Sequence, residues 1–411
     1  MIIRFFIVFI IASFHLNLNA QVFGCTDPLA NNYNSNATIN NGSCSYNSVT
    51  VSPILSNTLI TQLTETSGLI FWNDTIYTHN DNTDKRIYGL DSSSGSIIKT
   101  YSLGGLTNID WEEITQDSAS IFIGDFGNNV NGNRTNLRIY KVNKVSLWNN
   151  TPIIDTIKFS YSNQTTFTAT GSNNTDFDCE AFIAIKDSLY LFTKQWVSKQ
   201  TSVYKLPKTG GTYTAQLKYT HDVQGLITGA TFIKDSNMVA LCGYNNLLQP
   251  FFYLLYDYVG NVFFSGNKRK IYMNAAFHQT EGICSKNGAR FYGSNEYFSQ
   301  SPLPAVPQKL SVYDLGIYLY PSLSTDVKKT GLINSNRFTI FPSSVGDVLT
   351  IQSNSNTNFK YQIHDLLSNV ILSGNAHTNQ TQLPLIHLKS GLYTLTIQTD
   401  SLQEIFKFIK E

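Results

Sequence analysis

Charged side chains are scarce in this chain of 411 residues, because Asp, Glu, Lys and Arg together make up only 14% of it. An average soluble domain has roughly 25%. The formal net charge is +1, and the longest basic run is Lys268-Arg269-Lys270. Since nucleic acid is bound by concentrated positive charge, the sequence predicts no nucleic-acid partner.

Helical periodicity is also missing. No segment of helical length repeats its apolar residues every 3.6 positions, which argues against parallel α/β folds. Aromatic residues, in contrast, reach 13%, with 26 Phe and 23 Tyr, and such residues suit half-buried strands. We therefore expect an all-β protein.

A long apolar stretch occurs only at the N terminus. Arg4 precedes apolar residues 5–14, and the small residue Ala20 follows. This order is typical of a signal peptide over residues 1–20, with Gln21 as the first mature residue. The apolar stretch is too short to span a bilayer. We expect export through the periplasm and no transmembrane segment after cleavage.

The five cysteines have none of the spacings of a zinc site. Cys25 and Cys44 bracket a small Asn-rich module over residues 21–46, and export permits a disulfide between them. The other three, Cys179, Cys242 and Cys284, sit in apolar strand contexts and are expected to be buried free thiols.

Internal repeats mark the middle segment, residues 47–320. Five similar strand openings occur, and their equivalent residues are Ser67, Glu112, Glu180, Thr228 and Glu281. Successive members of this set are 45, 68, 48 and 53 residues apart. Each opening is followed by a turn and a second strand rich in aromatic and branched residues. Four strands in about 40 to 50 residues is the rhythm of propeller blades. The sequence predicts a β-propeller of five or six blades.

The sixth blade has two possible locations. One is the Ser/Thr/Asn-rich segment 161–176, and the other is a blade shared between strands of residues 47–64 and 310–320. Closure by strands from both ends of the segment would remove exposed sheet edges.

The residues at the openings are the candidate site. If the openings begin the innermost strands, Glu112, Glu180 and Glu281 converge on the central channel, with Ser67 and Thr228 at the remaining equivalent positions. Three facing carboxylates repel one another, so they favour a cation such as Ca²⁺ or Mg²⁺, or a cationic or hydroxyl-rich ligand. Alternatively, each Glu accepts backbone N–H bonds from the neighbouring blade and holds the blades together.

The last segment, residues 336–411, alternates apolar and polar residues in short runs, which is typical of a small Ig-like β-sandwich. Its blocks Arg337-Phe338-Thr339-Ile340-Phe341-Pro342, Asp347-Val348-Leu349-Thr350-Ile351 and Ser390-Gly391-Leu392-Tyr393 resemble the C-terminal sorting domain of type IX secretion cargo. Family members usually carry Pro-Asn-Pro where this chain has Pro342-Ser343-Ser344. The module around Gly24-Cys25-Thr26-Asp27-Pro28 resembles a motif of secreted proteins from Bacteroidetes-type bacteria. Residues 321–335 are expected to be a linker.

The middle segment resembles the phytase-esterase-like and SdiA-regulated-like propeller families. The resemblance rests on short motifs such as Asp110-Trp111-Glu112-Glu113-Ile114, Gly124-Asp125-Phe126-Gly127-Asn128-Asn129 and Thr280-Glu281-Gly282-Ile283. These families are chemically mixed, so the resemblance implies a fold and no single reaction.

Two functions follow from these patterns. The first is an exported protein at the outer-membrane surface or in the medium, handled by the type IX machinery, whose channel mouth binds a glycan, a metal, a phosphate ester or a peptide. The second is a metal-dependent hydrolase of phosphate or other esters. No G-x-S-x-G elbow or comparable nucleophile context occurs, which favours binding over catalysis.

Overall fold

The computed structural model describes residues 21–319, 338–341, 344–353, 358–365, 369–399 and 403–411. The predicted signal peptide and the predicted linker lie outside the described residues. The chain divides into two compact units, one ending at Leu315 and the other beginning at Gly316.

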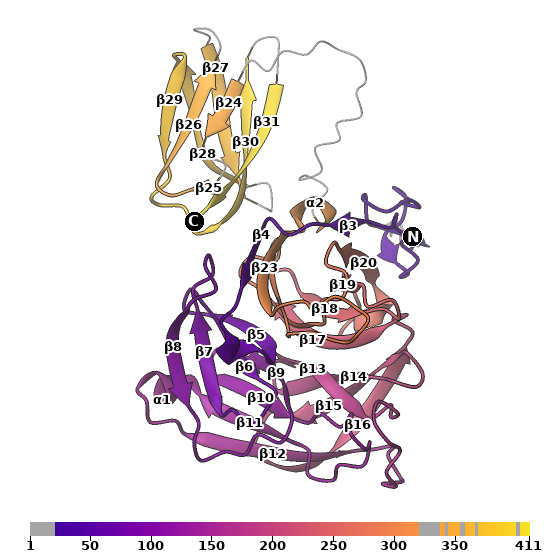
Figure 1. The fold of residues 1–411 in the computed structure, drawn as a ribbon. Coiled ribbons are helices and arrows are strands. Elements are labelled where there is room, and N and C mark those ends of the chain that lie inside the picture. Colours follow the sequence, from indigo (N-terminus) through magenta and orange to yellow (C-terminus); the bar gives the residue numbers. More distant parts are fainter. Residues whose placement is uncertain (1–20, 320–337, 342–343, 354–357, 366–368, 400–402) are drawn as a thin grey trace, which may run out of the picture. The chain divides into compact units, whose positions relative to one another are not determined.

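Five successive blades of four strands build most of the first unit (Figure 1), and the second and third blades join into one eight-stranded sheet. The first holds β5 (Thr66–Trp72), β6 (Thr75–Asn80), β7 (Arg86–Leu90) and β8 (Ile97–Ser102). The second holds β9 (Trp111–Gln116), β10 (Ser120–Asp125), β11 (Arg138–Asn143) and β12 (Ile154–Tyr161). The third holds β13 (Asp178–Ile185), β14 (Ser188–Lys194), β15 (Thr201–Pro207) and β16 (Gly211–His221). The fourth holds β17 (Leu226–Ile233), β18 (Met238–Tyr244), β19 (Pro250–Tyr256) and β20 (Asn267–Met273). The fifth holds β21 (Thr280–Ser285), β22 (Arg290–Asn295), β23 (Lys309–Asp314) and β4 (Leu55–Thr58).

The innermost strands close a ring. Contacts run from β5 to β9, β13, β17, β21 and back to β5. The described part of the first unit is therefore a five-bladed propeller. The segment 161–176 forms no sixth blade, since it instead hydrogen-bonds to the loop after β10 through pairs such as Asn173 N to Asn129 O.

Strands from both ends of the first unit complete the fifth blade, and do not form the shared sixth blade that the sequence suggested as one alternative. The early strand β4 pairs antiparallel with β23. The short strand β3 (Thr50–Val51) pairs parallel with β20 at the outer edge of the fourth blade. Blades two and three also share an edge, because β12 pairs parallel with β16. These pairings cover edges that would otherwise be exposed.

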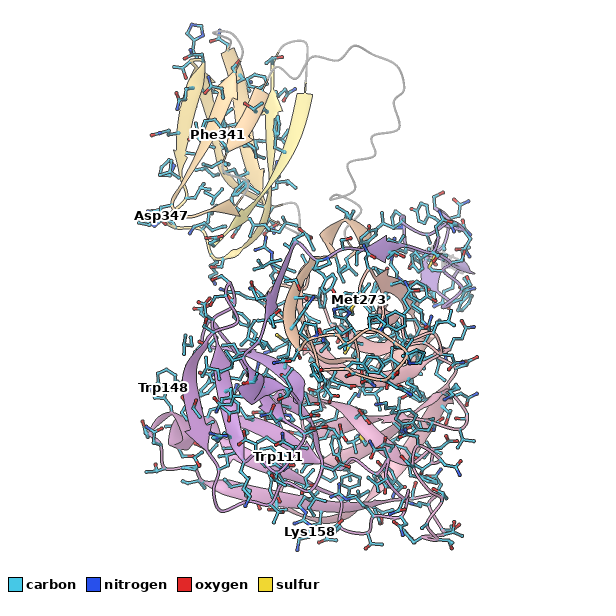
Figure 2. The ribbon with its side chains drawn as sticks, viewed as in Figure 1. Trp111, Trp148, Lys158, Met273, Phe341 and Asp347 are labelled. Atoms are coloured by element: carbon cyan, nitrogen blue, oxygen red, sulfur yellow. A yellow bond between two sulfur atoms is a disulfide. The ribbon has the colours of Figure 1, made fainter. Side chains whose placement is uncertain are left out.

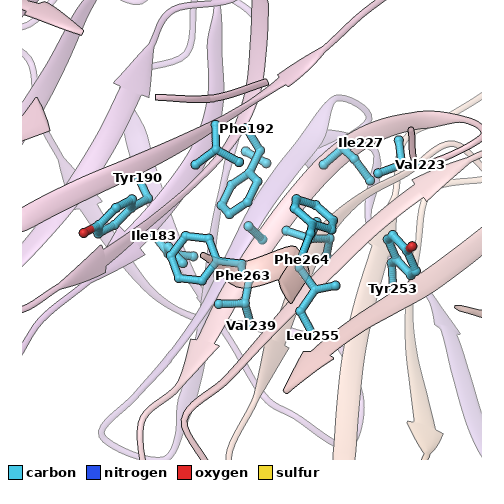
Figure 3. Packing of buried hydrophobic residues seen from close by; sticks show 14 of the residues in the cluster. Ile183, Tyr190, Phe192, Val223, Ile227, Val239, Tyr253, Leu255, Phe263 and Phe264 are labelled. Atoms are coloured by element: carbon cyan, nitrogen blue, oxygen red, sulfur yellow. The ribbon is translucent and has the colours of Figure 1, made fainter. Parts of the chain in front are cut away.

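Burial falls from the centre of each blade to its rim. Every residue of β13 is buried, whereas most of β16 is exposed or half-buried. The core lies in layers between neighbouring blades. Figure 3 shows one such layer, in which Phe263 and Phe264 from η2 (Phe263–Ser265) pack with residues of blades three and four. Figure 2 labels Trp111, which begins β9 and is fully buried.

The N-terminal module forms a small sheet of β1 (Phe23–Gly24) and β2 (Ile39–Asn40). The predicted disulfide joins Cys25 to Cys44, and the other three cysteines are free and buried. The module docks on the fourth blade, because the hydroxyls of Tyr46 and Tyr256 both donate to Asp27 Oδ2, at 2.7 and 2.6 Å.

Helices are few and short in the described chain. They are η1 (Thr61–Leu63), α1 (Lys144–Trp148), η2 and α2 (Gly316–Leu319). None of the described helices is long and apolar enough to cross a membrane.

Two sheets form the second unit, with a shared apolar core that includes Phe338, Leu349 and Leu395. This is the small Ig-like β-sandwich that the alternating pattern predicted. One sheet holds β24 (Phe338–Phe341), β26 (Val348–Ser353) and β29 (Gln380–Pro384). The other holds β25 (Ser344–Val345), β31 (Gln403–Lys410), β30 (Gly391–Gln398), β27 (Asn358–His364) and β28 (Val370–His377).

Candidate functional site at the channel mouth

A β-bulge opens the innermost strand of four blades at the residue that the repeats indicated. In β9, Trp111 pairs with Asp125 and Glu113 pairs with Gly124, so Glu112 is left between the two pairs. A bulge of this kind re-aims the side chain that it contains. The same register shift isolates Glu180, Thr228 and Glu281. In β5 the shift lies between Ser67 and Ile70.

These bulges bring carboxylates together at the end of the ring where the innermost strands begin, which we call the channel mouth. Glu112, Asp178 and Glu180 each offer a carboxylate oxygen within 4.8 Å of the others, and all three residues are buried. We call this set the buried triad. Two of the three predicted carboxylates thus meet, and Asp178, two residues before Glu180, joins them.

Glu281, the third predicted carboxylate, interacts electrostatically with Glu180. It is only 3% exposed, and its Oε2 atom has no hydrogen-bond partner among the described residues. A buried polar atom without a partner costs free energy in the folded state. It therefore indicates either a bound proton or a ligand.

A lysine faces the same carboxylates. Lys194 ends β14 opposite Asp178, and its Nζ atom lies 3.1 Å from Glu180 Oε1, with both side chains almost fully buried. Burial alone would lower the pKa of this ammonium, but the charges of Glu180 and Glu281 outweigh burial and hold the pKa well above its ordinary value. Lys194 is therefore a fixed positive charge at the mouth.

The pKa values at the mouth are high because the carboxyl groups are buried and close to one another. Burial, partly offset by Lys194, raises the pKa of Glu180 and of Glu281 to about 7. Burial and then the charge of Asp178 raise the pKa of Asp110 to about 6. Burial and then Glu180 raise the pKa of Glu112 well above its ordinary value. At neutral pH the mouth therefore holds protons that a cation can displace.

A second group of carboxylates lies on the neighbouring loops. Glu65, Asp81 and Glu296 also offer oxygens within 4.8 Å of one another, and each is half-buried. We call this set the half-buried triad. Backbone bonds hold these loops together, since Asp81 N donates to Glu65 O at 3.0 Å and Tyr297 N donates to Thr64 O at 2.9 Å.

The repeats also contain a signal for the half-buried triad, at the ends of the second strands. Asp81 follows the last residue of β6, and Glu296 follows the last residue of β22. The two positions are equivalent in their blades. Aligning the ends of the second strands, as well as the starts of the first, would have found them.

The remaining two candidates, Ser67 and Thr228, connect neighbouring blades. The Ser67 hydroxyl donates to the backbone oxygen of Glu112, and the Thr228 hydroxyl donates to that of Thr280. Glu113 connects blades two and four across the centre, because its carboxylate accepts from Ile114 N at 2.9 Å and from Ala230 N of β17 at 2.7 Å. Glu113, the neighbour of the candidate Glu112, is thus a buried Glu that holds blades together.

The Gly-rich turn after β10 also lies at the mouth. Asp125 pairs with Arg134 at 2.8 Å, and Arg134 Nη1 lies 4.0 Å from Asp110 Oδ2. A Cβ atom on Gly127 would lie 2.1 Å from Glu112 Oε1, so only glycine lets the backbone come this close to the carboxylate. The turn therefore supports the wall of the buried triad.

Comparison with known proteins identifies the C-terminal part. Residues 339–411 match the family described as a secretion system C-terminal sorting domain. The chain carries a type IX sorting domain. It is accordingly a secreted cargo protein, located at the cell surface or in the extracellular space. No curated protein matches the sequence.

Three solved structures with similarity to this chain are distant from it in sequence. PorZ, a surface component of the type IX secretion system of Porphyromonas gingivalis, is 11% identical with a TM-score of 0.30, and the match covers 84% of this chain. This chain spans 45% of the length of PorZ. A Bombyx mori GH32 β-fructofuranosidase is 9% identical with a TM-score of 0.36, covering 88% of both chains. The WD40 repeats of RRP9 are 8% identical with a TM-score of 0.30, covering 61% of this chain and 67% of that one. Similarities at this level carry no argument about function.

The resemblance to phytase-esterase-like and SdiA-regulated-like propellers is not confirmed and stays a prediction.

Proposed function

We propose that this exported propeller binds a divalent cation, Ca²⁺ or Mg²⁺, at its channel mouth. Glu112, Asp178 and Glu180 would be the ligands, and Glu281 would face the same ion. Carboxylate oxygens are the ligands that these hard cations prefer in proteins. A cation held here would complete the mouth as a binding site at the cell surface.

The observation that carries the proposal is the convergence of three buried carboxylates, Glu112, Asp178 and Glu180. Glu281 acts electrostatically on Glu180, and its buried Oε2 atom has no hydrogen-bond partner among the described residues. Four acids face one ammonium, that of Lys194, so ionising all four leaves an excess of negative charge in a buried site. Protons neutralise this excess at low pH. At neutral pH and above, a divalent cation neutralises it at a smaller cost.

A hydrolase of phosphate or other esters is the second candidate. It is favoured by the positions of Lys194 and Arg134, which lie at the same mouth as the carboxylates. Basic side chains beside a metal site can hold an anionic substrate. Carboxyl groups with a pKa of about 7, such as Glu180, also suit general acid–base chemistry.

Calorimetric titration of the folded protein with CaCl₂ at pH 7.5 tests cation binding. We expect saturable binding with release of protons, because displaced protons leave the carboxyl groups. The variant Glu180→Gln should bind at least tenfold more weakly. The exposed Asp235, in the turn between β17 and β18, allows the matched control Asp235→Asn, which removes the same charge away from the mouth.

The same samples separate the two candidates. If the loaded protein hydrolyses para-nitrophenyl phosphate or para-nitrophenyl acetate, and Glu180→Gln does not, the hydrolase is supported. Binding without turnover supports the binding protein. Absence of heat from both Ca²⁺ and Mg²⁺ up to millimolar concentrations rejects both candidates.

A further inference from the structure

A polar groove of about 740 Å³ opens on the first blade, lined by η1, by the loop that joins β6 to β7 and by the end of β8. Apart from Gly104, every residue that lines it carries a polar or charged side chain. Hydroxyl and amide groups predominate, for example those of Thr61, Gln62, Asn82 and Ser102. The volume lies in the range of small-molecule sites, roughly 300 to 1,000 Å³. The groove therefore suits a small molecule that is rich in hydroxyl groups.

The wall of the groove has one excess positive charge, because Lys85 and Arg86 supply two cations and Asp84 supplies one anion. Burial would raise the pKa of Asp84, but hydrogen bonds from Arg86 and Tyr88 outweigh burial and lower this pKa, so the carboxylate stays charged. Among the described residues, Lys85 forms no salt bridge. Its charge is therefore left to an anion from outside the chain.

The guanidinium of Arg86 is held in place with donors to spare. It donates to Asp84 through Nε at 2.7 Å and through Nη2 at 2.9 Å, and it lies 5.2 Å from the centre of the Tyr88 ring. Its Nη1 atom donates to none of the described residues. A guanidinium fixed in this way binds a carboxylate with little further ordering.

Asn80 gives a second, independent indication of a ligand. Its side chain lines the groove and is 1% exposed. Its Nδ2 donates to Gln62 O at 3.0 Å and to Asp84 Oδ2 at 3.2 Å, and since both partners only accept, the orientation of the amide is fixed. Its Oδ1 has no hydrogen-bond partner among the described residues. A buried acceptor without a donor is rare in native proteins, and a ligand hydroxyl would supply the donor.

We propose that this groove binds an acidic sugar, namely a hexuronate or a glycan that contains one. The sugar carboxylate accepts from Lys85 Nζ and Arg86 Nη1, and the ring hydroxyls bond to Asn80 Oδ1 and to the Thr61 and Ser102 hydroxyls. A carboxylate carries one negative charge, which equals the excess positive charge of the wall, whereas a phosphate ester carries about 1.5 to 2. The site is separate from the cation at the buried triad and does not depend on it.

The test is a calorimetric titration of the full-length protein at pH 7 in the presence of EDTA. D-Glucuronate is compared with D-glucose, which has the ring without the charge, and with acetate, which has the charge without the ring. We expect glucuronate to bind at least tenfold more tightly than either. Glucose 6-phosphate, which has the ring and a larger charge, should bind no more tightly than glucuronate.

Two variants locate the binding in the groove. Lys85→Gln removes the uncompensated charge, and Ser102→Asp adds a negative charge opposite Arg86, with which Ser102 pairs across the two strands. Each should weaken glucuronate binding at least tenfold, while Lys85→Arg should keep it. The matched control is Lys218→Gln, which removes the same charge from an exposed position on β16 of the third blade and should change nothing.

Four outcomes would overturn the proposal. They are glucuronate affinity equal to that of glucose or of acetate, tighter binding of glucose 6-phosphate, no glucuronate binding up to about 50 mM, and unchanged binding in Lys85→Gln and Ser102→Asp. Circular dichroism of each variant identifies a failure to fold, and two separate variants guard against one being lost in this way. Glu180→Gln should keep its affinity for glucuronate, so failure of the cation proposal and failure of this one give different results.

Discussion

The replacement Glu281→Gln tests the physical state of the channel mouth directly. Glu281 is 3% exposed, and burial raises its pKa to about 7 from an ordinary value of 4.5. The pKa of Glu281 is higher in the folded state than in the unfolded state, so its neutral form stabilises the folded state. This stabilisation is fully present below pH 4.5 and is lost as the pH rises through about 7. One pKa unit corresponds to about 1.4 kcal/mol, so the loss amounts to about 3 kcal/mol.

Glutamine has nearly the same shape and does not ionise. In EDTA at pH 8, we therefore expect Glu281→Gln to be more stable than the wild type by up to about 3 kcal/mol. At pH 4.5 the two proteins should differ much less, because Glu281 is then neutral in the folded wild type. Urea unfolding at both pH values, followed by tryptophan fluorescence, measures the difference.

Two results would refute this reasoning. One is a Glu281→Gln variant that is less stable than the wild type at pH 8, which would mean that the carboxylate makes favourable bonds in its charged form. The other is a difference between the two proteins that does not change with pH. Asp235→Asn serves as the control for the general effect of removing one acidic residue.

Three further predictions concern Lys194, the disulfide and the sorting domain. Lys194→Met removes the ammonium from a buried pair and should lower the free energy of unfolding by about 3 kcal/mol or more at pH 8 without metal, measured by urea unfolding. The affinity of this variant for Ca²⁺, measured by calorimetry, should rise because the competing positive charge is gone. Cys25→Ala should lower the free energy of unfolding of the first unit by about 3 kcal/mol, because the disulfide restricts the unfolded chain, and a loss smaller than 1 kcal/mol would contradict this. Peptide mass spectrometry of the unreduced wild type should find Cys25 joined to Cys44, with the other three cysteines reduced. Deleting residues 336–411 should leave the protein in the periplasm, which immunoblots of cell fractions would detect; normal amounts of the truncated protein in the medium would contradict it.

The sequence predicted much of the fold because the fold is repetitive. The spacing of Ser67, Glu112, Glu180, Thr228 and Glu281 located all five innermost strands, since each blade repeats the same opening. The number of blades could not be decided, because the segment 161–176 is long enough for part of a blade and its hydrogen bonds to the loop after β10 depend on tertiary structure. The closure of the fifth blade by β4 and β23 followed from the general need to cover sheet edges.

The candidate site was predicted in part. The repeats indicated that Glu112 and Glu180 point to a common centre, and the bulges at these positions explain why. Asp178, Lys194 and Glu296 were not assigned to the centre, because they belong to strand ends and loops whose direction the repeat pattern does not determine. The role of Glu113 as a connection to β17 also required the structure, since two adjacent Glu residues on one strand look equivalent in the sequence.

The measurement that tests the central claim most directly is the melting temperature of the wild type and of Glu180→Gln, at pH 7.5, as CaCl₂ or MgCl₂ is raised to 10 mM. An ion that binds only the folded state stabilises it by about 2.7 kcal/mol at a concentration 100 times its dissociation constant. We predict a melting temperature that rises with Ca²⁺ or Mg²⁺ in the wild type, and a much smaller rise in Glu180→Gln. An unchanged melting temperature in the wild type across the whole range of both ions would contradict the cation site.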